Sequence, residues 1–168
     1  GHAGSFAAVA AHAGGNFHPR KWRGAVTDLT GRWLILDWVQ HYDDGRVVRP
    51  LGERLVGFIQ YGADGTMSCV IADADRKRLS AGQWNSPAQE RADAYSRYLS
   101  YSGRYRIEGD TVVHEVEISL FPNWEGGRQV RRFRLSGDDL DLTARLEEGT
   151  SEARTAALRW RRDTSARA

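Results

Sequence analysis

The sequence has a single cysteine and no long apolar run. Because Cys69 stands alone, an internal disulfide and a cysteine-cluster metal site are both excluded. No apolar stretch approaches the roughly 20 residues that a membrane-spanning helix needs, so we expect no membrane partner. His41 and His114 are the only histidines after residue 26, and they have no metal-ligand spacing, so we expect no metal site.

The chain also lacks a surplus of charge of either sign. Its formal net charge is +2, but residues 1–26 hold three basic residues and no acid. Without that segment, 21 of the 24 Lys+Arg remain against 22 Asp+Glu, so we expect no nucleic-acid partner. No glycine-rich motif leads from a strand into a helix to hold phosphate groups, and we expect no cofactor.

The length and the N-terminal composition predict one domain behind a leader. A chain of 168 residues can bury a substantial core but is too short for two ordinary domains. Residues 1–26 are rich in Gly and Ala and show no strand period. A secretory signal would need a basic start and a longer apolar centre, so we expect a tag-derived or disordered leader. We assign residues 27–168 to one domain and expect a cytoplasmic protein.

Residues 103–142 carry the clearest strand pattern. Glu108-Gly109-Asp110 and Gly137-Asp138-Asp139 are turn sequences in which the chain reverses at little steric cost. Between them apolar residues alternate with polar ones, which is typical of strands with one buried and one solvated face. The residues that share the apolar parity are Val112, Val116, Ile118 and Leu120 on one strand and Phe133 and Leu135 on the next.

The rest of the chain continues this pattern at hairpin spacing, without a βαβ rhythm or a repeat. Ser86-Pro87-Ala88-Gln89 predicts the start of one helix over about 86–101, which carries Tyr95, Tyr98 and Tyr101. That helix is either a packing element over one barrel end or a lid that shapes a pocket. We therefore predict an all-β fold: a single up-and-down barrel of 8–9 antiparallel strands with one covering helix and room for a small ligand.

Several motifs in order resemble the lipocalin-like domain family of bacterial and fungal proteins. The motifs are Gly31-Arg32-Trp33-Leu34-Ile35, Asp44-Gly45-Arg46, Tyr61-Gly62-Ala63-Asp64-Gly65, His114-Glu115-Val116, Pro122-Asn123-Trp124 and Gln129-Val130-Arg131-Arg132-Phe133. The resemblance covers about residues 29–162 and implies the barrel fold. It places Trp33 at the barrel base. We expect the Trp33 ring to stack against Arg159 or Arg161. Some family members lie in natural-product gene clusters, and related barrels include ligand carriers and cofactor-free cyclases.

His114 and Arg131 are the candidate catalytic residues. Each lies on the apolar parity of its strand, so an imidazole and a guanidinium are expected inside the barrel, where polar groups must be paired or used. His114 could exchange a proton near neutral pH, and Arg131 could stabilise a developing enolate oxygen. The structural alternatives are a hydrogen-bonded core histidine and an arginine paired with Glu117 or Asp37.

Further residues are predicted to contact the ligand through apolar or phenolic surface: Tyr61, Met67, Tyr98, Tyr105, Trp124 and Phe133. Trp124 lies in a loop at the barrel mouth, either as an anchor of that loop or as a gate. We predict that a small, largely apolar organic ligand enters the barrel and undergoes cofactor-independent cyclisation, isomerisation or dehydration in natural-product metabolism. The alternatives are a non-catalytic carrier and a domain whose polar interior is purely structural. A monomer and a homodimer both remain open.

Overall fold

The structure, a computed structural model, describes residues 28–165, so the leader predicted over residues 1–26 lies outside the described part of the chain. Within that part, nine strands, one α-helix and one short 3-10 helix follow one another. Their bounds are β1 (Gly31–Tyr42), β2 (Val47–Val48), β3 (Leu55–Tyr61), β4 (Thr66–Asp73), α1 (Ala88–Ser96), β5 (Tyr98–Glu108), β6 (Thr111–Ser119), η1 (Pro122–Trp124), β7 (Arg128–Ser136), β8 (Asp139–Leu146) and β9 (Arg154–Arg162).

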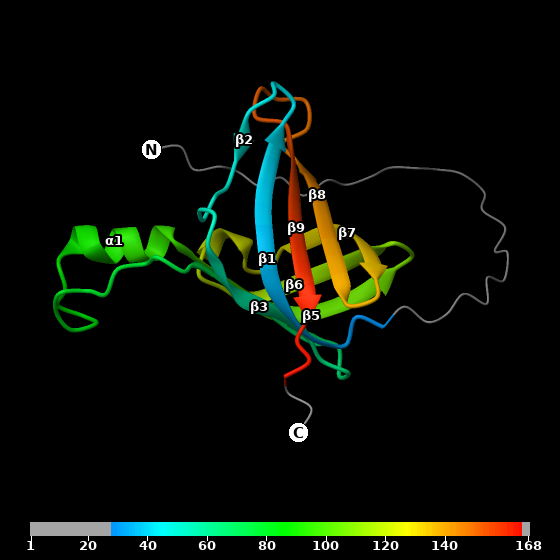
Figure 1. The fold of residues 1–168 in the computed structure, drawn as a ribbon, viewed down its shortest axis with the longest axis horizontal. Coiled ribbons are helices and arrows are strands. Elements are labelled where there is room, and N and C mark those ends of the chain that lie inside the picture. Colours follow the sequence, from blue (N-terminus) through cyan, green and yellow to red (C-terminus); the bar gives the residue numbers. More distant parts are fainter. Residues whose placement is uncertain (1–27, 166–168) are drawn as a thin grey trace, which may run out of the picture.

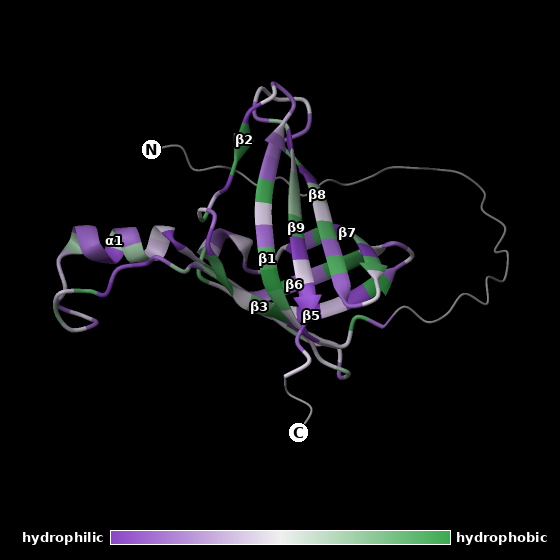
Figure 2. Cartoon of the chain, in the orientation of Figure 1, coloured by the Kyte–Doolittle hydropathy of each residue, from purple (hydrophilic) through white to green (hydrophobic). Residues whose placement is uncertain are grey.

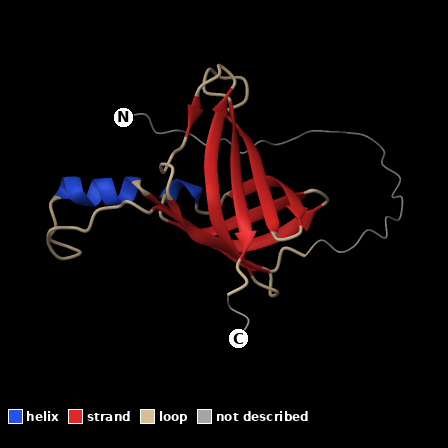
Figure 3. Cartoon of the chain, viewed as in Figure 1, coloured by secondary structure: helices blue, strands red, loops and turns tan. Residues whose placement is uncertain are grey.

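The strands form one antiparallel sheet that closes on itself (Figures 1 and 3). Strands β3 to β9 pair in sequence order, and β1 pairs both with β3 and, between Trp33 and Tyr42, with β9. The two-residue strand β2 is an addition on the edge of β1. Closure removes the free edges of the eight main strands and encloses an interior. The predicted all-β barrel is confirmed.

The interior is built by alternation of buried and exposed residues, which is clearest along β8, where hydrophilic and hydrophobic residues alternate (Figure 2). Trp33 marks the closed end and is fully buried. Its indole N–H donates to the Leu29 carbonyl oxygen at 2.9 Å, and the Arg162 guanidinium lies 4.1 Å from the ring centroid. The prediction that Arg159 or Arg161 stacks on Trp33 is wrong. Trp33 and Arg162 are cross-strand partners, and directly opposed residues lie on the same side of a sheet.

Two bulges change which residues face the interior. In β1 the register shifts between Ile35 and Asp37, which turns Trp38 inward and Asp37 outward, where it pairs with Arg49 at 3.5 Å. The prediction that Asp37 shares the inward parity of Trp33 is therefore wrong.

In β6 the register shifts opposite Ser102 and Gly103, so Ile118 faces solvent with 64% of its surface exposed, and Ser119 faces the interior. The inward position predicted for Ile118 is wrong for this reason. At Gly103 the strands approach so closely that a Cβ atom would lie 1.8 Å from the Glu115 carbonyl oxygen, so only glycine fits.

The helix is shorter than predicted and does not cover the barrel. Residues 98–101 belong to β5, where Leu99 pairs with Ile71 and Tyr101 pairs with Cys69, so the helix ends at Ser96 rather than near 101. No residue of α1 is buried, and it projects sideways from the barrel (Figures 1 and 3). Over residues 28–165, no helix is long and apolar enough to cross a membrane.

Replacing Arg162 with Ala should lower the free energy of unfolding by about 1–3 kcal/mol, because the variant loses the stacking on Trp33 and the hydrogen bond to the Thr30 carbonyl oxygen. The neighbouring Arg161→Ala is the matched control. Arg161 makes a solvent-exposed ion pair with Asp139, so its loss should cost less than about 1 kcal/mol. Urea denaturation of both variants measures the difference, and equal losses would contradict this account of the closed end.

Candidate functional site

A cavity of about 400 Å³ lies inside the barrel, with walls from the strands and from residues near η1 and the end of α1. Its size is that of small-molecule sites. Most of the lining is apolar, and its aromatic members are Trp38, Tyr95, Tyr98, Tyr101, Phe121, Trp124 and Trp160. Within residues 28–165, no aspartate or glutamate lines it.

Cross-strand register explains where the cavity begins. Ile59, Cys69, Tyr101 and Ser119 are successive partners across β3 to β6, and all four line the cavity. The next inward row towards the closed end contains Tyr61, Met67, Gly103 and Val116, which are buried and form the floor beneath it. The cavity therefore starts one row above the packed floor.

This register separates the predicted site residues into two groups. His114, Arg131, Tyr98 and Trp124 line the cavity. Four others do not line it and pack within or against the core: Tyr61, Met67, Tyr105 and Phe133. The geometry of the cavity therefore gives no support to ligand contact by these four.

The two residues predicted to be catalytic are thus brought to the same cavity. The structure places them there as parts of its wall, and their catalytic roles stay predictions.

His114 is held between two tyrosines. Its Nε2 atom lies 2.8 Å from the Tyr61 hydroxyl, and its Nδ1 atom lies 2.9 Å from the Tyr101 hydroxyl. The side chain is fully buried, so both ring nitrogens are occupied without water. This arrangement is the hydrogen-bonded core histidine that the sequence left open as an alternative, placed at the boundary between the floor and the cavity.

Burial keeps the titratable groups around His114 neutral. Burial first, and then the positive charge of Arg131, lower the pKa of His114 to about 3. Burial also raises the pKa of Cys69 to about 12 and raises the pKa of both Tyr61 and Tyr101 above the usual value for tyrosine. At neutral pH the wall therefore holds an uncharged imidazole, thiol and phenols.

Arg131 brings the positive charge to this wall. Its guanidinium donates to the Gln129 side-chain oxygen at 2.8 Å and to the Val130 carbonyl oxygen at 3.0 Å. The carboxylates considered as partners from the sequence are used elsewhere: Glu117 pairs with Arg104, and Asp37 pairs with Arg49. Over residues 28–165 no carboxylate forms an ion pair with Arg131, and no group of three or more His, Cys, Asp or Glu could hold a metal ion.

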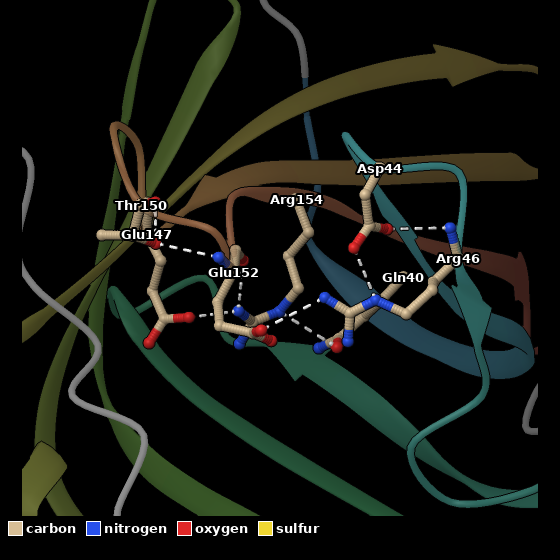
Figure 4. Close-up of polar contacts among 7 residues, drawn as sticks. All are labelled: Gln40, Asp44, Arg46, Glu147, Thr150, Glu152 and Arg154. Atoms are coloured by element: carbon tan, nitrogen blue, oxygen red, sulfur yellow. Dashed lines mark hydrogen bonds and ion pairs between the residues drawn. The ribbon is translucent and has the colours of Figure 1, made fainter.

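A polar network holds the rim of the barrel near the cavity (Figure 4). Arg154 on β9 donates to the Gln40 side-chain oxygen at 3.1 Å and pairs with Glu147 at 2.5 Å. Gln40 lines the cavity from β1. On the same rim, Arg46 pairs with Asp44 and Glu152, so the turn after β1 is joined to the loop between β8 and β9. The network fixes the strands that frame one side of the cavity.

Of the seven aromatic wall residues, sequence reasoning named only Tyr98 and Trp124 as ligand contacts and missed the other five, Trp38 and Trp160 among them. Trp38 is out of phase with Trp33 and Ile35 because of the bulge in β1, and simple alternation gives no sign of a bulge. Trp160 could have been found, because Ala156, Leu158 and Trp160 alternate on β9 and all three line the cavity. Tyr101 was assigned to the helix, which hid its inward position on β5.

Comparison with known proteins agrees with this architecture. Residues 30–163 match the family described as lipocalin-like domain. The chain belongs to this family. The resemblance inferred from the motifs at Gly31-Arg32-Trp33 and beyond is thereby confirmed.

Two proteins illustrate the range of similarity to this lipocalin-like protein. The 4′-hydroxy-3′-methoxypropiophenone carrier protein ppsC of Aspergillus oryzae (strain ATCC 42149 / RIB 40) is 43% identical over 63 residues, which cover 33% of this chain and 57% of the fungal protein. The chain thus matches little more than half the length of that relative. A crystal structure of an uncharacterized protein from Bacteroides eggerthii DSM 20697 is 14% identical over 81% of this chain and 100% of the other, with a TM-score of 0.41.

The buried His114 should make the stability of the lipocalin-like barrel depend on pH. Between about pH 6.5 and pH 3 the unfolded chain binds a proton at His114 that the folded chain does not, so stability falls as the pH falls. From pH 7 to pH 5 this contributes a loss of about 2 kcal/mol. Urea denaturation at the two pH values should show that the free energy of unfolding falls by about 2 kcal/mol less in His114→Gln than in the parent protein.

His41→Gln is the control, because it removes a histidine on the exposed surface and leaves the buried His114 in place. If His114→Gln loses as much stability on acidification as the parent protein, the imidazole is not held neutral in the folded state.

Proposed function

We propose that the protein binds a small, largely apolar aromatic molecule inside the barrel and carries it without transforming it. The observation that supports this most directly is the cavity of about 400 Å³, whose wall is mostly apolar and aromatic. Burial of apolar ligand surface against such a wall favours binding, and a few polar groups fix the orientation.

The state of the polar groups favours a carrier over the cyclase, isomerase or dehydratase considered from the sequence. A general acid or base works best when its pKa lies near the working pH and when it can reach the substrate. His114 has a pKa lowered to about 3, and both of its nitrogens are engaged by tyrosines. Arg131 could still polarise a ligand oxygen, but among the wall residues that the structure describes it has no proton-transfer partner with a pKa lowered or raised to near neutral pH.

The relative from Aspergillus oryzae gives independent support of limited extent. It is named as a carrier of 4′-hydroxy-3′-methoxypropiophenone, an aromatic ketone of a size suited to such a cavity. The match covers 57% of that protein, so its ligand serves here as a first probe. The identity of the molecule that this chain binds is part of the proposal. A cytoplasmic location and a place in natural-product metabolism stay predictions from the sequence.

The proposal is tested by calorimetric titration of the full chain with 4′-hydroxy-3′-methoxypropiophenone. We expect saturable 1:1 binding that weakens at least about tenfold in Ala156→Phe, which fills the cavity from β9. Ala157→Phe is the matched control, because Ala157 borders a groove on another face of the barrel and does not line the cavity. Leu146→Trp, at a less tightly packed lining position, serves as a second filling variant if Ala156→Phe does not fold.

The same mixtures decide between carriage and turnover. After incubation with excess protein, chromatography with mass detection should recover the ligand unchanged. A product of equal mass with a different retention time, or one lighter by a water molecule, would replace the carrier proposal with the isomerase or dehydratase hypothesis. Equal affinity in Ala156→Phe, Leu146→Trp and Ala157→Phe would place the bound molecule outside the barrel.

A further inference from the structure

The indole N–H groups of two cavity-lining tryptophans have no acceptor in the described part of the chain. The Nε1 atoms of Trp38 and Trp160 are buried, and neither has a hydrogen-bond partner within residues 28–165. Both residues line the cavity, Trp38 from β1 and Trp160 from β9. Buried polar groups in folded proteins are nearly always paired, so two unpaired donors on one wall need an explanation. Their place on the cavity suggests that the missing acceptor comes from whatever occupies it.

A third donor follows from the proton count around His114. A neutral imidazole has one N–H group and one acceptor nitrogen, so one of the two tyrosines donates to the ring and the other accepts from it. Tyr61 is buried, and its hydroxyl has no other hydrogen bond within the described chain, so it must donate to Nε2 or leave its proton without an acceptor. Nδ1–H then donates to the Tyr101 oxygen.

This arrangement leaves the Tyr101 proton for the cavity. The remaining neighbour of the Tyr101 hydroxyl is the thiol of Cys69, and sulfur accepts hydrogen bonds only weakly. Tyr101 itself lines the cavity. An oxygen of a bound molecule would be a better acceptor than the thiol, so the chain from Tyr61 through His114 makes Tyr101 a donor towards the interior.

The rest of the cavity wall also offers more hydrogen-bond donors than acceptors. Arg131 has five N–H donors and no acceptor, and its two hydrogen bonds to Gln129 and Val130 leave others free. No carboxylate of the described part of the chain lines the cavity, and both nitrogens of His114 already have hydrogen-bond partners. The strand order places β5, which carries Tyr101, across the barrel from β1 and β9, which carry the two tryptophans. Residues that carry donors therefore line the cavity on opposite sides.

We propose that the cavity selects molecules with two separated hydrogen-bond-accepting oxygens on an apolar aromatic body, one oxygen bound by Tyr101 and the other by an indole N–H of Trp38 or Trp160. Arg131 adds positive potential that favours an electron-rich oxygen such as a ketone. A ligand with donors in place of acceptors would leave these groups unpaired and bind more weakly. This inference rests on the proposed binding function and names the chemical class of the ligand.

A set of four probes tests the inference by removing one oxygen at a time: 4′-methoxypropiophenone, propiophenone, 4-propylanisole and propylbenzene. Calorimetry on the full chain should give the tightest binding for the first, with about a fivefold to tenfold loss for each oxygen removed. The alcohol 1-(4-methoxyphenyl)propan-1-ol, which replaces the ketone by a donor-bearing group, should bind more weakly than the ketone.

Variants assign each oxygen to its partner. Tyr101→Phe should lose about tenfold in affinity for one of the two single-oxygen probes, propiophenone or 4-propylanisole, because one donor is removed. Its affinity for the other single-oxygen probe should be nearly unchanged. Trp38→Phe should show the opposite preference if the indoles bind the second oxygen. Tyr105→Phe is the matched control, since Tyr105 lies on the same strand, does not line the cavity and donates to the Gly62 carbonyl oxygen at 2.9 Å.

The outcomes separate this inference from the function on which it rests. If neither the four probes nor 4′-hydroxy-3′-methoxypropiophenone binds, the proposed function fails. If all four bind with equal affinity, the cavity binds apolar molecules but the selection for oxygens is wrong. If affinity is graded but is the same in Tyr101→Phe as in Tyr105→Phe, the assignment of Tyr101 as the donor is overturned.

Discussion

The pairing of β1 with β9 closes the sheet, and the site depends on this closure. The contact runs from Trp33 at one end of β1 to Tyr42 at the other, so the first and last strands share almost their whole length. It brings Arg162 over Trp33 at the closed end and Arg154 beside Gln40 at the rim. Without it, Trp38 and Trp160 would lie on separate edges, and the cavity would have no wall on that side.

The interior combines a tightly packed floor with polar groups that are uncharged at neutral pH. The floor beneath the cavity is filled by the row that contains Tyr61 and Met67, and burial keeps His114, Cys69 and Tyr101 just above it uncharged at neutral pH. Among the cavity-lining residues that the structure describes, only Arg131 carries a charge, and its side chain is partly buried. A wall of this kind can hold an uncharged organic molecule and orient it with little means of moving protons to or from it.

Alternation and turn residues were enough to predict the barrel, because period-two patterns and hairpin turns are local properties of the chain. The same patterns placed His114 and Arg131 inside correctly. The prediction was wrong at Asp37 and Ile118 because of two bulges. One extra residue in a strand reverses which side chains beyond it face the interior, and the alternating sequence pattern does not reveal such a residue. Tyr98 and Tyr101 were assigned to the helix because the helical spacing of Ala88, Ala92 and Tyr95 continues to Leu99. Strand pairing with β4 overrides that spacing.

The projecting helix gives the molecule two levels of local stability. Because no residue of α1 is buried, its amide groups are protected only by its own hydrogen bonds, and local opening there need not disturb the barrel. Tyr95 and Ser96, at the end of α1, line the cavity together with Tyr101 and His114 of the barrel. We therefore expect the amide hydrogens of α1 to exchange with solvent faster than those of the strands that form the rest of the cavity wall.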